Sequence, residues 1–155
     1  MLQILVADDH ALLRKGLQDL LEAHPGWQVC GEAIDGRQAV LLAEKLKPDI
    51  AVLDLLMPEL NGIEATHRIR DVSPATGVLV LAGNYSEVIE EECIAAGARG
   101  YVLKSNSEDR VIAAIESLAR GETSFVREAS RRGAPTPPFG TRLQGPGAGL
   151  TSREI

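Results

Sequence analysis

The chain has 155 residues, of which 45% are hydrophobic, and a net charge of −6. This length and composition are sufficient for one domain with a hydrophobic core. The charge is unevenly distributed: residues 1–120 contain 11 Lys and Arg against 19 Asp and Glu, whereas residues 121–155 contain 5 against 3. Because an acidic surface repels nucleic-acid phosphates, the charge argues against nonspecific nucleic-acid binding by residues 1–120.

The chain carries no signal for export or membrane insertion. No window approaches the ~20 apolar residues of a membrane span, and the N-terminus "MLQILVADD" lacks the basic start of a secretion signal. The two cysteines, Cys30 and Cys93, are far apart in sequence and show no metal-binding spacing. We therefore expect a cytoplasmic protein, not bound to a membrane, with two reduced core thiols.

The first half of the chain alternates strand and helix patterns. Apolar residues 4–7 predict a buried strand, and leucines spaced three or four apart over residues 13–21 predict the helix that follows. Residues 27–33 predict a second strand. Residues 39–46 predict a second helix, which ends before Pro48 because proline disfavours helical backbone at the residue preceding it.

The same alternation continues three more times. Strands are predicted at residues 50–54, 77–82 and 100–104, and helices at residues 61–70, 86–96 and 111–119. Gly97 is typical of a residue that ends a helix, and Ser107 is the predicted N-cap of the last one. Unbroken apolar strands indicate a sheet buried on both faces. The predicted fold is therefore α/β, a doubly wound five-stranded parallel sheet covered by helices, over residues 1–120.

The composition changes after residue 120. Residues 133–149 contain five Gly and four Pro, too little apolar surface to fold, so we predict a flexible linker over residues 121–149. The final "LTSREI", residues 150–155, is too short for a domain and is interpreted as the first turn of a helix whose domain is truncated.

Three acids and one lysine follow predicted strands. Asp8 and Asp9 come after the first strand, Asp54 ends the third, and Lys104 ends the fifth. Because parallel strands present their carboxyl ends at one edge, we expect these four side chains to meet there. The alternative is that the three acids are unrelated helix caps and that the lysine is an ordinary surface residue. We consider this the weaker interpretation, because all four residues lie at strand ends.

Carboxylates held together repel each other, and a hard divalent cation relieves that repulsion. Carboxylates, carbonyls and water are the ligands of Mg²⁺, which it shares readily with phosphate. The predicted metal ligands are Asp8, Asp9, Asp54 and the backbone carbonyl of Leu56. Asp54 is the predicted nucleophile, which would form an aspartyl-phosphate, and Lys104 would contact the phosphoryl group.

The segments "VADDH" (Val6–His10), "LDLLMPELNG" (Leu53–Gly62) and "AGARGYVLK" (Ala96–Lys104) resemble the receiver domain of two-component response regulators. With Ser105 after the lysine and the terminal "LTSRE", the chain is similar to the LuxR/NarL-type subfamily. The resemblance implies a flavodoxin-like strand order 2-1-3-4-5. It also implies phosphoryl transfer from a sensor histidine kinase to Asp54, in a signalling protein rather than an enzyme. A C-terminal helix-turn-helix domain would then bind DNA to regulate transcription, with homodimers as a further expectation.

One position departs from that family pattern. The family ends its fourth strand with Thr or Ser, whose hydroxyl binds the phosphoryl group and draws in an aromatic residue, here Tyr101. The present chain has Ala82 at that place, and a methyl group cannot donate a hydrogen bond. This leaves an alternative open: a phosphorylation-independent interaction module, or pseudo-receiver, that retains the acidic pocket without the switch.

Three further interpretations complete the sequence-based picture. A phosphatase of the haloacid dehalogenase type is disfavoured, because Leu56 occupies the place of the second Asp that such enzymes use as general acid. Glu90 to Glu92 are predicted to form a solvated acidic face, with docking of a partner protein as the second interpretation. Tyr101 is predicted to be partly buried.

Overall fold

The computed structural model describes residues 1–106 and 108–127. Residues Met1–Phe125 form one compact unit, five residues longer than the predicted domain, and the remainder of the chain is a second unit. The predicted N-cap Ser107, most of the predicted linker and the terminal residues 150–155 lie outside the described residues.

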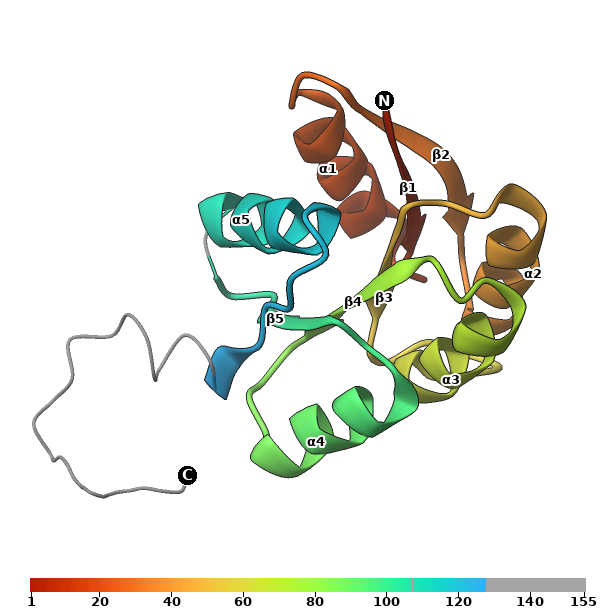
Figure 1. Cartoon of the computed structure of the whole chain (residues 1–155), viewed down its shortest axis with the longest axis vertical. Coiled ribbons are helices and arrows are strands. Elements are labelled where there is room, and N and C mark those ends of the chain that lie inside the picture. The colour runs from red at the N-terminus through yellow and green to blue at the C-terminus, as the bar shows by residue number, and fades with distance from the viewer. Residues whose placement is uncertain (107, 128–155) are drawn as a thin grey trace, which may run out of the picture. The chain divides into compact units, whose positions relative to one another are not determined.

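Ten elements alternate along the first unit, as the sequence predicts (Figure 1). Their bounds are β1 Leu2–Ala7, α1 Ala11–Glu22, β2 Trp27–Ala33, α2 Gly36–Leu46, β3 Ile50–Asp54, α3 Gly62–Val72, β4 Gly77–Ala82, α4 Glu87–Ala96, β5 Gly100–Leu103 and α5 Glu108–Ala119. Side chains cap several helices: Asp35, Asn61 and Ser86 accept hydrogen bonds from the first turns of α2, α3 and α4.

All strand pairs are parallel, and the strand order is β2-β1-β3-β4-β5. This confirms the predicted order 2-1-3-4-5. The central strands β3 and β4 are buried along their whole length, because helices cover both faces of a parallel sheet.

Two apolar layers lie on the two faces of the sheet. On one face, Ile4, Val6 and Val52 pack with residues of α1 and α5, such as Leu21 and Ile115. On the other face, alternate strand residues pack with α2, α3 and α4 (Figure 1). Because successive strand residues point to opposite faces, each strand contributes to both layers.

Among the described residues, no helix combines the length and the apolar character needed to span a bilayer. Cys93 is fully buried, whereas Cys30 is only partly buried, and both are free thiols. Burial raises the pKa of the Cys93 thiol to about 11, with the carboxylates of Glu90 and Glu92 adding to the effect.

Candidate functional site

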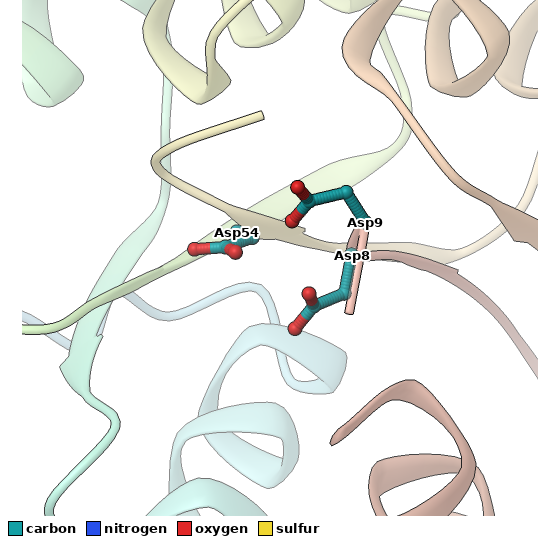
Figure 2. Close-up of side chains that lie close together, drawn as sticks. All are labelled: Asp8, Asp9 and Asp54. Atoms are coloured by element: carbon teal, nitrogen blue, oxygen red, sulfur yellow. The ribbon is translucent and has the colours of Figure 1, made fainter. Parts of the chain in front are cut away.

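Three carboxylates converge at the carboxyl edge of the sheet. Asp8 and Asp9 follow β1 and Asp54 ends β3, and their ligand oxygens lie within 4.8 Å of one another (Figure 2). Asp8 and Asp54 are 3% and 5% exposed, whereas Asp9 is exposed. We call this group of three residues the acidic pocket: the carboxylates of Asp8 and Asp54 are buried, and that of Asp9 is open to solvent.

Backbone hydrogen bonds fix the strand ends that carry these acids. The amide of Asp8 donates to the carbonyl of Ala33, and the carboxylate of Asp8 accepts from the amide of His10, at 3.0 and 2.8 Å. The amide of Leu55, directly after Asp54, donates to Leu81 at 2.8 Å. The sheet ladder therefore continues up to the acids and sets their separation.

Lys104 completes the pocket. Its amide donates to the carbonyl of Ala82 at 2.7 Å, which continues the β4–β5 pairing one residue beyond Leu103. Its ammonium Nζ lies 3.0 Å from Asp54 Oδ2, and its side chain is 32% exposed. The lysine therefore supplies the positive charge nearest to Asp54 while keeping access to solvent.

Burial raises the pKa of the Asp54 carboxyl above its usual value. The hydrogen bond and charge of Lys104 oppose this rise, and repulsion from Asp8 adds to it. The group as a whole sets three carboxylates against one ammonium, and a further cation would balance their charge.

Leu56 lies beside the pocket with its side chain directed to solvent. The side chain is 75% exposed, and its amide is 3.4 Å from Asp54 Oδ1, a long contact for a hydrogen bond. The role of its carbonyl as a metal ligand stays a prediction.

Behind the pocket, Ala82 and Tyr101 form a small apolar cluster with Phe125. Tyr101 is 1% exposed, so the prediction of partial burial underestimated its burial. Its hydroxyl donates to the carbonyl of Asn84 at 3.2 Å. The ring packs in one cluster with Ala82, a relationship that the sequence pattern did not indicate.

The predicted acidic face on α4 is wrong for Glu90. Glu91 and Glu92 are exposed, but Glu90 is fully buried and accepts a hydrogen bond from the hydroxyl of Tyr85 at 3.1 Å. A tyrosine five residues before the glutamate is the only sequence signal for this contact. The run of acids masks it, because it looks like one solvated surface.

Sequence reasoning also missed Arg14, which lies on α1 beside the pocket. Its guanidinium donates to the carbonyl of Asp8 at 2.8 Å and to Glu32 at 3.0 Å. Next to it, a cavity of about 310 Å³ extends from Asp8 and Lys104 between α1 and the start of α5. Its lining includes the α1 side chains Leu12, Leu13 and Leu17.

Over most of its length the chain is similar to known proteins. Residues 4–116 match the family model of the response regulator receiver domain. The chain is 38% identical over 120 residues to the transcriptional regulatory protein DegU of Brevibacillus brevis, covering 77% of this chain and 51% of DegU. It spans between half and two thirds of the length of this and other curated transcriptional regulators that it matches.

Solved structures are similar as well. A two-component response regulator of the LuxR family from Aurantimonas shows 34% identity and a TM-score of 0.79, covering 83% of this chain and 92% of that one. The isolated REC domain of RcsB from Salmonella enterica, solved in the presence of the phosphomimetic BeF₃⁻, shows 26% identity and a TM-score of 0.75. That match covers 84% of this chain and 96% of the RcsB chain.

Proposed function

Because this chain belongs to the response regulator receiver domain family, we propose that it accepts a phosphoryl group on Asp54 from the phosphohistidine of a sensor histidine kinase. The observation that carries the proposal is the meeting of Asp8, Asp9 and Asp54 in one pocket with Lys104 beside them. The chain would act as a signalling protein rather than as an enzyme with a separate substrate.

The chemical step is a displacement at phosphorus. A carboxylate oxygen of Asp54 attacks, the phosphorus–nitrogen bond of the phosphohistidine breaks, and its electron pair remains on the imidazole of the kinase. An acyl phosphate on Asp54 results. Catalysis of such a transfer depends on positioning and on neutralising the phosphoryl oxygens. Lys104 is positioned for this, because its ammonium already contacts Asp54 and is partly exposed.

The donor set fits Mg²⁺. Three carboxylates are hard oxygen ligands, and their spacing of up to 4.8 Å is close to what one small cation can bridge after minor side-chain adjustment. Asp8, Asp9 and Asp54, with the Leu56 carbonyl, are the proposed ligands. When bound, the ion supplies positive charge to the phosphoryl oxygens, and the residues themselves set its position.

We propose that the kinase docks on the surface beside the acidic pocket. The cavity between α1 and α5 joins Asp8 and Lys104 to an apolar stretch of α1, in which Leu12 and Leu13 are 77% and 49% exposed. An apolar helix of the kinase lying in this cavity would bring its histidine to the acidic pocket.

The output is proposed from the relatives. DegU is named a transcriptional regulatory protein, and we propose that phosphorylation here likewise controls transcription in the cytoplasm. Contact with DNA would come from a C-terminal helix-turn-helix domain. Residues 1–120 themselves carry a net negative charge, which disfavours contact with DNA phosphates. Homodimer formation would accompany activation.

Acetyl phosphate with Mg²⁺, followed by intact-mass measurement, tests the proposal. We expect an adduct of about 80 Da, the mass of one added PO₃H, on the wild-type chain. Asp54→Asn should abolish it, whereas Asp71→Asn, which changes an exposed acid on α3, should retain it. Absence of the adduct on the wild type, or its persistence in Asp54→Asn, would refute phosphorylation at Asp54.

A pseudo-receiver is the second candidate. The observation favouring it is the contact of the Ala82 methyl group with a Tyr101 ring that is already buried, so no hydroxyl is available to link a phosphoryl group to the aromatic residue. Mg²⁺ titration followed by beryllofluoride separates the two. Metal binding with no beryllofluoride-dependent spectral change beyond the metal ligands, neither at Tyr101 nor in α4, would favour the pseudo-receiver. A change in α4 while Tyr101 stays as it is would favour a receiver that responds to phosphorylation without the Tyr101 switch.

A further inference from the structure

The segment after α5 returns to the sheet instead of leaving it. Gly121 has a φ of +82°, a left-handed conformation that glycine adopts without strain and that turns the chain at the end of α5. Residues 121–125, called the strap below, then run along β5. Ser124 forms an isolated parallel bridge with Gly100.

The strap pairs with the free edge of β5, the last strand of the sheet. The amide of Tyr101 donates to the carbonyl of Ser124 at 3.0 Å, and the amide of Ser124 donates to the carbonyl of Arg99 at 2.9 Å. The guanidinium of Arg99 donates in turn to the carbonyl of Gly121. β5 is the last strand of the sheet, so these bonds satisfy backbone groups that an edge strand otherwise exposes.

The strap also covers the aromatic side chain of β5. Phe125 is 7% exposed and packs with Tyr101 and Ala82. If the Tyr101 ring left this cluster, it would leave a cavity beside Phe125 and Ala82, and cavities are unfavourable in a close-packed interior. The backbone and side-chain contacts of the strap therefore act on the same residue.

From these contacts we infer that the strap helps to hold the Tyr101 ring buried, together with the hydrogen bond from its hydroxyl to the Asn84 carbonyl and the edge contact with the Tyr85 ring. The strap is a conformational device: its release from β5 would remove Phe125 from the packing around Tyr101 and allow the ring to turn outward. Ala82 lies between the strap and the acidic pocket, since its carbonyl accepts from Lys104 and its methyl group touches Tyr101. The strap therefore links the packing of Tyr101 to β5, the strand that Lys104 directly follows.

Amide hydrogen exchange measured by NMR on the full chain, without Mg²⁺ or a phosphoryl donor, tests this inference independently of phosphorylation. Phe125→Ala removes the packing, and Ser124→Pro removes the amide that donates to Arg99. In each variant we expect the Tyr101 amide to exchange at least about tenfold faster than in the wild type, which reports release of the strap, and the Tyr101 ring protons to become accessible to a soluble paramagnetic relaxation agent, which reports the ring. Amides of β1 and β3 should keep their protection and report an intact core.

Val88→Ala is the matched control. Val88 is an apolar residue of α4 that is 63% exposed, and its truncation should leave the Tyr101 amide unchanged. Wild-type exchange at Tyr101 in both strap variants, a Tyr101 ring that stays shielded after the strap is released, or equal effects in the control would each overturn the inference. Beryllofluoride with Mg²⁺ should leave the Tyr101 ring of the wild type as shielded as before; a marked gain in shielding would show that the ring is not already held.

Discussion

The ammonium of Lys104 lies 3.0 Å from Oδ2 of Asp54, although the two residues are 50 positions apart in the chain. The contact joins the ends of β3 and β5 across β4, which separates them in the sheet. It places a cation where a phosphoryl group on Asp54 would carry its negative charge.

Lys104→Met should slow the phosphorylation of Asp54. A hydrogen bond to a charged group contributes about 1.5–3 kcal/mol, so we expect about a 10- to 150-fold lower rate with acetyl phosphate. The measurement is the rate of appearance of the mass adduct. Lys47→Met, which changes a lysine remote from the pocket at the end of α2, should react at the wild-type rate. Equal rates in all three proteins would show that Lys104 does not act in the transfer.

Asp54→Asn should stabilise the metal-free protein near neutral pH. The folded state raises the pKa of Asp54, so the folded protein binds this proton more tightly than the unfolded chain. Stability from this group is therefore complete below the unfolded pKa of about 3.9 and is lost as the pH rises through the raised folded value.

Thermal unfolding at several pH values measures this effect. We expect the variant to gain on the order of 1 kcal/mol at pH 7 and the gain to disappear near pH 3. A variant that is less stable than the wild type at pH 7 would contradict the prediction.

Mg²⁺ should raise the melting temperature through the three carboxylates. At 100 times its dissociation constant a ligand of the folded state adds about 2.7 kcal/mol. Asp8→Asn, which removes one buried ligand, should reduce this shift, and EDTA should reverse it. Asp71→Asn should leave it intact, so an equal loss in that variant would indicate nonspecific ion binding.

Ala82→Thr should place a hydroxyl at the end of β4 at a cost in stability. Ala82 is fully buried against Tyr101 and Phe125, so the added atoms should destabilise the fold by about 1–3 kcal/mol. Ala82→Val adds nearly the same volume without a hydroxyl and is the matched control. Both should lose stability, and only the threonine variant should gain a beryllofluoride-dependent change at Tyr101. The same response in the valine variant would assign it to volume rather than to hydrogen bonding.

The periodicity of apolar residues was sufficient to predict all ten elements, because a buried parallel strand and a one-sided helix have different sequence patterns. The strand order came from resemblance to a known family. The meeting of Asp8, Asp9, Asp54 and Lys104 followed from one geometric fact, that parallel strands end at a common edge.

Other features depend on contacts that no local pattern encodes. Glu90 stands in a run of acids yet is buried against Tyr85, and Phe125 stands at the start of a segment that was predicted to be a linker yet packs on Tyr101. The sequence alone determined the order of the strands along the chain, their bounds to within two residues (the first strand begins at Leu2 rather than Ile4 and the last ends at Leu103 rather than Lys104), and which residues occupy the sheet edge, since these follow from short-range periodicity. Only the tertiary structure decided which side of β5 the returning chain covers and how deeply Tyr101 is buried, because both depend on close packing between residues remote in sequence.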